Sequence, residues 1–237
     1  MRLVSSDPAA SAREPVSESA RDSVSESARE FVREHTAVAP VPFAPEISLR
    51  VAPEAIPLWE LTEQVTGEIG LPPPFWAFAW AGGQALARYV LDHPELVAGR
   101  TVLDIAAGSG LVAVAAARAG AARVVANEID VYADAAIAIN ADLNGVTVER
   151  VLGDLLGTDP EADVVLAGDV FYSREMAGLV LGFLRRAHDR GALVLVGDPG
   201  RAYRPKEGFA EAAAYRVPVN ADLEDAESKP TTVLRMI

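Results

Sequence analysis

The stretch Thr101–Ala117, which reads TVLDIAAGSGLVAVAAA, constrains the fold more than any other part of the chain. Thr101–Ile105 is a short apolar run, Ala106–Gly110 is almost free of side chains, and a run of Leu, Val and Ala begins at Leu111. This order predicts a buried strand, a tight turn and the N-terminus of a helix. Glycines let a ligand approach the backbone, and a helix start offers unpaired N–H groups. The turn is therefore a candidate nucleotide-cofactor site.

The turn fits two cofactor motifs. Read from Gly108, it is G-S-G-L-V-A, which matches the dinucleotide fingerprint G-x-G-x-x-G/A. Read from Asp104, it is D-x-A-x-G-x-G, which resembles the D/E-x-G-x-G-x-G motif of class I S-adenosylmethionine (SAM) methyltransferases, with Ala106 replacing the first glycine. A carboxylate before the loop would repel a pyrophosphate but suits a ligand that carries an ammonium and a sulfonium. We therefore favour SAM over a nicotinamide cofactor. The residues expected at its site are Asp104, Ala106, Gly108 and Gly110. The alternative is that the glycines only let the turn pack tightly.

Composition narrows the class of protein. The 237 residues, 50% of them hydrophobic, can bury one core, so one domain with appendages is expected. No run of about 18 apolar residues could span a membrane, and the N-terminus lacks the apolar core of a secretory signal. The chain has no cysteine, and its three histidines show no ligand spacing, so no metal site is expected. We expect a soluble, cytoplasmic protein.

The charge of the chain argues against a nucleic-acid substrate. The net charge is −13, and residues 1–50 carry six basic and eight acidic side chains, so residues 51–237 contribute about −11. Binding to phosphates needs clustered basic residues, but this chain has only Lys206 and Lys229 beside scattered arginines. A neutral or cationic substrate fits the acidic surface better.

Residues 1–40 are rich in Ser, Glu, Ala and Arg and contain a duplication, because VSESARD at 16–22 recurs as VSESARE at 24–30. An eight-residue offset matches neither a heptad nor a common solenoid repeat. We therefore predict a low-complexity tail that is disordered or forms a weak helix, followed by a cofactor-binding domain over residues 41–237.

Apolar runs alternate with helical patterns through this domain. The expected strands are 46–51, 101–105, 123–130, 146–152, 163–172, 192–197, 212–217 and 231–236, and the expected helices are 58–66, 84–92, one beginning at 111, 132–143 and 174–188. The alternation predicts a parallel sheet, and the last two strands lack a helix between them. We expect a Rossmann-like α/β fold with seven strands, mostly parallel with an antiparallel C-terminal strand, and helices on both faces. An antiparallel pair at the C-terminus is expected of class I methyltransferases, whereas dinucleotide-binding sheets usually stay parallel.

Acidic residues follow the predicted strands. Glu128 lies 18 residues after Gly110, where a carboxylate commonly holds the ribose hydroxyls. We assign the ribose to Glu128, and we assign Asp130 to the cap of the helix that begins near Tyr132. Asp154, after the next strand, could accept from the adenine amino group or cap the following turn.

Aromatic residues gather before the glycine pair Gly82-Gly83 in the stretch LPPPFWAFAWAGG. Phe75, Trp76 and Phe78 are expected to pack in the core. Trp80, nearest the glycines, is expected either to pack or to contact the cofactor.

Several segments together resemble the seven-strand lysine methyltransferases related to the electron-transfer-flavoprotein β-subunit enzyme. The segments are PEISL, PLWE, LPPPFWAFAWAGGQALARYVLDHP, LDIAAGSG, LAGDVFY and GDPGR. This resemblance implies that Trp80 and Gly168 line the cofactor site and that the D-x-x-Y motif, Asp169 to Tyr172, borders the acceptor pocket. Ala106 and Glu128 depart from the family pattern, which more often has Gly and Asp there.

The resemblance implies transfer of a methyl group from SAM to a lysine ε-amine of a protein, with the β subunit of electron transfer flavoprotein as the expected substrate. Asp169 and Tyr172 would orient the amine. The alternative for Asp169 is a helix cap. Two other functions remain open: methylation of a small amine or another protein, and SAM binding without catalysis.

Overall fold

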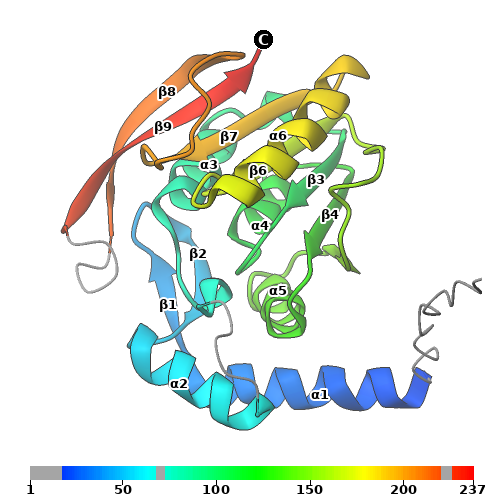
Figure 1. The fold of residues 1–237 in the computed structure, drawn as a ribbon, viewed down its shortest axis with the longest axis vertical. Coiled ribbons are helices and arrows are strands. Elements are labelled where there is room, and N and C mark those ends of the chain that lie inside the picture. The colour runs from blue at the N-terminus through cyan, green and yellow to red at the C-terminus, as the bar shows by residue number, and fades with distance from the viewer. Residues whose placement is uncertain (1–17, 68–72, 220–225) are drawn as a thin grey trace, which may run out of the picture.

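The computed structural model describes residues 18–67, 73–219 and 226–237. A seven-stranded sheet forms its centre (Figure 1). The strands are β3 (Thr101–Ile105), β4 (Arg123–Glu128), β5 (Glu149–Leu152), β6 (Val164–Gly168), β7 (Leu193–Asp198), β8 (Phe209–Pro218) and β9 (Ser228–Met236). Their order is β5-β4-β3-β6-β7-β9-β8. β9 runs antiparallel to both neighbours and every other pair is parallel, so the predicted fold is confirmed.

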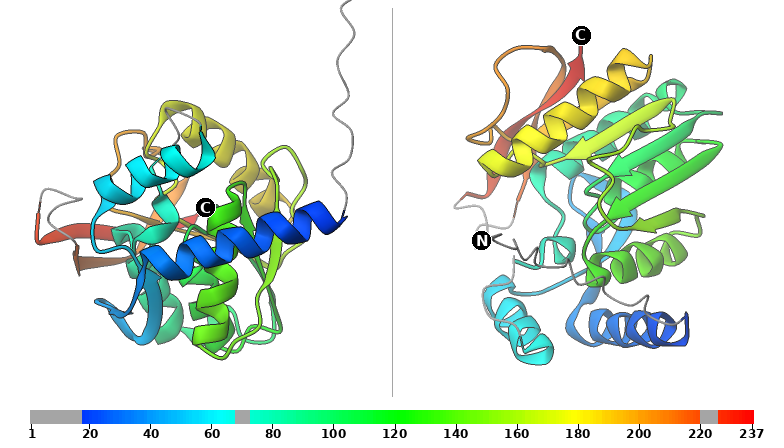
Figure 2. Two further views of the ribbon diagram at one scale, coloured as in Figure 1. Left: turned by 90° about the horizontal axis from the view of Figure 1, so that it is seen from below. Right: turned by 45° about the vertical axis from the view of Figure 1, so that its right-hand side comes forward.

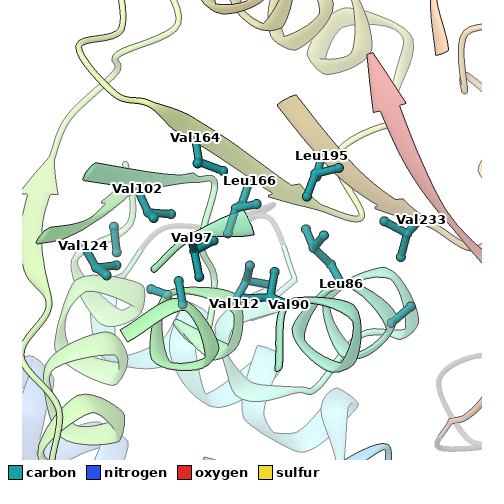
Figure 3. Close-up of a cluster of buried hydrophobic side chains, with 14 of the residues drawn as sticks. Leu86, Val90, Val97, Val102, Val112, Val124, Val164, Leu166, Leu195 and Val233 are labelled. Atoms are coloured by element: carbon teal, nitrogen blue, oxygen red, sulfur yellow. The ribbon is translucent and has the colours of Figure 1, made fainter. Parts of the chain in front are cut away.

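Helices cover both faces of the sheet (Figures 1 and 2). On one face lie α3 (Ala81–Asp92), α4 (Leu111–Arg118) and α5 (Val131–Leu143), and on the other lies α6 (Arg174–Asp189). Figure 3 shows the interface between the sheet and the face covered by α3 and α4, where Leu86 and Val112 meet Val102, Leu166 and Leu195. The central strands are nearly continuous apolar runs because both of their faces are covered. No helix in the described ranges is both long and apolar enough to cross a membrane.

For residues 1–40 the sequence left disorder or a weak helix open, and the described part of this segment is helical and packed on the domain. Residues 18–40 contain α1 (Glu18–His35) and most of β1 (Ala37–Val41), which pairs antiparallel with β2 (Ala44–Val51). In α1 the side chains of Ala28, Phe31 and Val32 are buried, and their i, i+3, i+4 spacing gives the helix an apolar stripe. This stripe packs on α5, which α1 crosses (Figure 2). The folded domain therefore begins before residue 41, whereas residues 1–17 lie outside the described part.

Three further helical segments lie in the N-terminal half of the described chain. α2 (Ala55–Thr66) follows β2, and its predicted position over 58–66 is confirmed apart from three extra residues at its start. The 3₁₀ helix η1 (Phe75–Ala77) precedes α3, and η2 (Pro94–Leu96) follows it. η1 lies beside the loop after β3, because a Cβ atom on Gly108 would lie 3.9 Å from the Phe75 carbonyl oxygen.

The start of α3 sits directly on the sheet, backbone against backbone. A Cβ atom on Gly168 would lie 2.9 Å from Gly83 Cα, and one on Gly197 would overlap the Gly82 carbonyl. Real Cβ atoms essentially never come within 3.0 Å of such neighbours. A Cβ atom on Gly82 would likewise lie 2.3 Å from the Gly197 carbonyl oxygen, whereas one on Gly83 would make only ordinary contacts. Gly82, Gly168 and Gly197 therefore allow α3 to contact the carboxyl ends of β6 and β7, which a larger residue at these three positions would prevent.

Asp104 ties β3 to α4. Its side chain is only 1% exposed, and its Oδ2 accepts the Ala113 N–H at 2.9 Å. That N–H lies in the first turn of α4, where backbone donors lack partners within the helix. Burial raises the pKa of Asp104 to about 8, with the hydrogen bond from Ala113 opposing the shift and the charge of Glu128 adding to it.

Two glycine-to-alanine substitutions, with opposite expected effects on the free energy of unfolding, test the packing of α3 on the sheet. We expect Gly197→Ala to lower the free energy of unfolding by about 2 kcal/mol, because its methyl group must displace the Gly82 carbonyl. The matched control is Gly178→Ala in α6, where an added Cβ meets nothing within 4 Å. It should raise stability by roughly 0.5–1 kcal/mol through helix propensity. Urea denaturation measures both. A Gly197→Ala protein as stable as the wild type would show that α3 can shift off the sheet.

The raised pKa of Asp104 makes stability depend on pH. Between the ordinary pKa of 3.8 and a value of about 8, the folded chain holds a proton that the unfolded chain has released. Stability should therefore fall as pH rises through this window. Asp104→Asn keeps an oxygen for the Ala113 N–H but does not titrate, so its stability relative to the wild type should rise between pH of about 5 and about 8. Glu149→Gln, at an exposed ion pair, is the control and should track the wild type. If the curves of unfolding free energy against pH ran parallel for Asp104→Asn and the wild type, Asp104 would not hold a proton in the folded chain.

Candidate active site

The carboxyl edge of the sheet carries the loop that follows β3. Ala106, Gly108 and Gly110 have φ values of 53°, 54° and 77°, and the Gly110 N–H closes the turn by donating to Ala107 O at 2.8 Å. Ala106 thus adopts the left-handed conformation that the motif's glycine would adopt, at a cost of about 1–2 kcal/mol for a residue with a Cβ atom. Ala106 therefore carries local backbone strain at the position where the motif has glycine.

Glu128, at the end of β4, supports this loop from the side. Its Oε1 accepts the Gly108 N–H at 2.7 Å, and its Oε2 accepts the Ile129 N–H at 3.0 Å. Burial raises the pKa of Glu128, and these two backbone hydrogen bonds oppose the shift. Each carboxylate oxygen has a second lone pair, so Glu128 can still accept from a pair of ribose hydroxyls.

The two other acids near Glu128 accept backbone N–H groups in turns. Asp130 accepts the Tyr132 N–H at 2.8 Å, so its predicted role as the cap of α5 is confirmed. Asp154 accepts the Leu156 N–H at 2.8 Å, which is the turn-capping alternative. Its contact with an adenine amino group stays a prediction.

Asp104 lies behind the loop, where its Oδ2 is bonded to Ala113. Asp104 therefore supports the cofactor loop by holding the start of α4, and it does not present an exposed carboxyl group to a ligand. A direct contact between Asp104 and the amino-acid end of SAM therefore stays a prediction.

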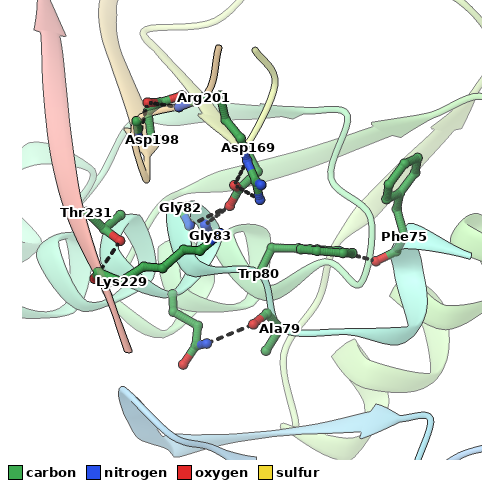
Figure 4. Close-up of polar contacts among 12 residues, drawn as sticks. Phe75, Ala79, Trp80, Gly82, Gly83, Asp169, Asp198, Arg201, Lys229 and Thr231 are labelled. Atoms are coloured by element: carbon green, nitrogen blue, oxygen red, sulfur yellow. Dashed lines mark hydrogen bonds and ion pairs between the residues drawn. The ribbon is translucent and has the colours of Figure 1, made fainter. Parts of the chain in front are cut away.

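Asp169 joins three elements at the end of β6 (Figure 4). It has a positive φ of 57° and is 8% exposed. Its Oδ2 accepts from the N–H groups of Gly82 and Gly83, the latter at 3.2 Å, and its Oδ1 accepts from Arg201 Nε at 2.9 Å and Nη2 at 2.7 Å. The helix that Asp169 caps is α3, whereas Ser173 caps the following α6. Local sequence could not reveal this cap, because the capped residues lie more than 80 positions away.

Aromatic rings line the space between the loop and Asp169. The Phe75 ring lies 5.8 Å from Trp80 and 5.2 Å from Tyr172, measured between centroids. Trp80 Nε1 donates to the Phe75 carbonyl at 2.8 Å, as Figure 4 shows. Tyr172 is 45% exposed, so the group opens to solvent. Burial, together with the charge of Glu128, raises the pKa of the Tyr172 hydroxyl. These contacts place Tyr172 near both the cofactor loop and Asp169.

Two of the predicted cofactor residues have packing roles in the structure. Gly168 allows the close approach of Gly83, and Trp80 packs against Phe75 and Phe78. A cleft lined by Pro40, Phe78 and Pro218 also borders Trp80 on the side of the β1–β2 hairpin. Whether Gly168 and Trp80 also line the cofactor stays a prediction.

Arg201 belongs to this site, although its sequence context suggested no role. It follows β7 in the turn Asp198-Pro-Gly-Arg201, in which Asp198 Oδ1 accepts the N–H groups of Gly200 at 2.7 Å and Arg201 at 3.1 Å. Its guanidinium carbon lies 5.8 Å from the centroid of the Trp80 ring. The only sequence signal was the Asp-Pro-Gly turn, which fixes the backbone but not the direction of the arginine side chain.

The arrangement fits SAM. The loop after β3 leaves its backbone partly exposed at Gly108, whereas Gly110 is buried against Ile137. The helix α4 begins directly behind the loop, and Glu128 offers anionic acceptors beside it. In the described ranges, no three His, Asp or Glu side chains gather in a way that could hold a metal ion.

Comparison with known proteins gives the family. Residues 84–172 match the model of the ribosomal protein L11 methyltransferase (PrmA) family. The electron transfer flavoprotein beta subunit lysine methyltransferase of Xenopus laevis is 40% identical over 173 residues, which cover 71% of this chain and 69% of that protein. The human enzyme of the same name is 38% identical over 161 residues, covering 66% of this chain and 60% of that protein. The Caenorhabditis elegans homolog is 33% identical, covering 70% of this chain and 74% of that protein.

A solved structure shows the same fold at low sequence identity. The 16S rRNA methyltransferase of T. thermophilus, solved with AdoMet and guanosine, aligns with a TM-score of 0.53 and 21% identity, covering 85% of this chain and 49% of that one. This likeness concerns the fold, while the sequence relatives define the family. The chain belongs to the family of electron transfer flavoprotein beta subunit lysine methyltransferases and is a SAM-dependent class I methyltransferase.

Proposed function

We propose that this protein methylates lysine side chains of the β subunit of electron transfer flavoprotein. The observation that carries the proposal is the 40% identity to an enzyme named for that reaction, together with one sheet edge that joins the Glu128-supported loop to the Asp169–Tyr172 segment. The acceptor must reach this edge, because the cofactor loop and the exposed Tyr172 both lie there.

The chemistry needs a neutral amine. A lysine of pKa about 10.4 is roughly 0.1% neutral at pH 7.4, so releasing its proton costs about 4 kcal/mol. Bound SAM supplies a methyl group on a cationic sulfur. The chain supplies orientation and a partly buried environment, which disfavours the ammonium form.

We assign different tasks to the two D-x-x-Y residues. Tyr172 is 45% exposed, and we propose that its hydroxyl contacts the acceptor amine. Asp169 already accepts from Gly82, Gly83 and Arg201, so we propose that it orients the acceptor indirectly, by fixing α3 and Arg201. No general base is needed when the proton leaves to water before transfer.

Glu128→Gln tests the cofactor site. The glutamine oxygen can still accept the Gly108 N–H, but the anionic acceptor for the ribose is lost. A charged hydrogen bond is worth about 1.5–3 kcal/mol, so calorimetry should show SAM and S-adenosylhomocysteine binding weakened roughly 10- to 150-fold. The matched control is Asp130→Asn, since asparagine also caps helices well and should leave affinity unchanged. No NAD binding is expected for any of these proteins. If the Glu128→Gln protein bound SAM as tightly as the wild type, Glu128 would not be the residue that holds the ribose.

A methylation assay tests the acceptor. With labelled SAM, we expect label on the flavoprotein β subunit, and mass spectrometry should place it on lysine. The signal should weaken from low to high salt, because the acidic chain attracts a basic substrate through exposed charges. The matched control replaces the labelled lysines by arginines, which keeps their charge but offers no neutral amine.

Other outcomes of this assay would change the assignment. Label on another protein or on a small amine, with none on the flavoprotein, would keep the methyltransferase and remove the named substrate. SAM binding without transfer to any acceptor in a cell extract would support a non-catalytic binding module.

A further inference from the structure

We propose that two copies of this chain associate by pairing the outer edges of their β8 strands. The two strands run antiparallel around a two-fold axis and join the two sheets into one. This inference goes beyond the proposed function, because β6, β7 and β9 separate β8 from β3 and the cofactor loop. It assigns a role to a surface that the methyl transfer does not use.

The strand β8 is a long edge strand with one open side. It spans ten residues, stands last in the strand order, and pairs with β9 alone among the described strands. Figure 1 shows it as the outermost strand of the sheet. The backbone groups on the outer side of an edge strand are ready to pair with another strand. Proline occurs in β8 only as its last residue, Pro218, so it does not block the middle of this edge.

A bulge decides which side chains of β8 lie on the same face. The register with β9 shifts by one residue between Glu211 and Ala213, so Ala212 is an extra residue in the ladder. Side chains alternate between the two faces of a regular strand, and residues five apart would therefore lie on opposite faces. The extra residue reverses this alternation. Glu211 and Arg216 consequently lie on the same face of the sheet.

These two opposite charges are placed symmetrically about Ala214. In the ladder with β9, Glu211, Ala214 and Arg216 are opposite Leu234, Thr232 and Pro230, respectively. Each charged residue is thus two paired positions from Ala214, one before it and one after it. A two-fold axis perpendicular to the sheet at Ala214 therefore places each Glu211 opposite Arg216 of the second copy.

This symmetry favours a second copy of the chain over an unrelated strand. Glu211 and Arg216 are both exposed, and the printed contact of Arg216 is one hydrogen bond to Ser228 Oγ at 3.3 Å, which lies at the surface. Directly opposed cross-strand side chains attract when their charges are opposite and repel when they are alike. Charges on an edge strand normally keep other strands away, but here one acid and one base give two attractive pairs between identical copies.

The side chains near the axis also fit close approach of two strands. Ala214 is exposed and lies against Ala214 of the second copy in this register. On the other face, the small Ala213 lies opposite the large Tyr215 of the second copy. No two bulky side chains meet at the centre of the interface, so the backbones can approach to the spacing of paired strands.

Charge reversal tests the register. By sedimentation equilibrium, we expect the wild type to form a dimer. Glu211→Arg places like charges opposite each other at both pairs, and so does Arg216→Glu, so each should weaken the dimer about tenfold or more. An equal mixture of the two variants restores opposite charges at both pairs and should dimerise like the wild type. The control matched in charge is Arg185→Glu at an exposed position of α6, which should not weaken the dimer.

A disulfide between copies tests the position of the axis. The chain has no cysteine, so an introduced thiol can pair only with the same thiol of another copy. Directly opposed residues of antiparallel strands have Cα atoms about 4.5–5.5 Å apart, which suits a disulfide. Ala214→Cys should therefore give a covalent dimer under mild oxidation. Ala210→Cys is the matched control, because this exposed residue lies three paired positions from Ala214 and its two copies would be about 20 Å apart.

Two results would overturn the proposal. The first is a wild type that stays monomeric at millimolar concentration. The second is a dimer that neither charge reversal weakens and that Ala210→Cys links as readily as Ala214→Cys. Far-UV circular dichroism and S-adenosylhomocysteine binding establish that each variant is folded, so that a weaker dimer reports the interface itself. Methylation of the flavoprotein is measured separately, and its absence would refute the proposed function without affecting this inference.

Discussion

The contact between the start of α3 and the carboxyl ends of β6 and β7 determines how the active edge is built. Gly82, Gly168 and Gly197 allow backbone to meet backbone there, and Asp169 then completes the first turn of the helix. Trp80, the residue before α3, has no side-chain cap of its own. The same carboxylate that caps α3 also holds Arg201, so any loosening of this contact would disturb the helix, the turn after β7 and the aromatic group together.

Acidic residues at the strand ends share one task in this structure. Asp104 bonds to the first turn of α4, Asp169 to the first turn of α3, and Glu128 to the loop at Gly108. In each case a side-chain carboxyl group accepts from backbone N–H groups at the start of a helix or in a loop. An acid at the end of a strand is commonly interpreted as a ligand contact, but it can first serve to hold the binding surface in shape. Glu128 retains the capacity for both roles because its oxygens have lone pairs to spare.

Periodicity predicted most of the fold, because Thr101–Ile105 and the helix from Leu111 are determined by local patterns. It gave β6 too many residues, since the apolar run continues beyond the point where Asp169 turns to a positive φ. It also missed the packing of α1, whose few buried residues lie within a repetitive polar segment. The partners of Asp169 and the direction of Arg201 depend on contacts across 32 to 87 positions. Such contacts follow from the topology of the sheet and not from any local pattern.

The position of β9 has a consequence for how the chain reaches this state. β9 lies between β7 and β8, so β8 has no sheet neighbour until residues 228–236 have been made. During synthesis, the fourteen helices and strands that precede β7 in the described part of the chain could associate while β7 still exposes a free edge and β8 remains unpaired. Closing the sheet requires β9 to pair with the free edge of β7, which was made much earlier, and such non-local pairing is slow. Folding intermediates of this protein are therefore expected to expose the β7 edge, which makes that edge the natural place for a chaperone to bind.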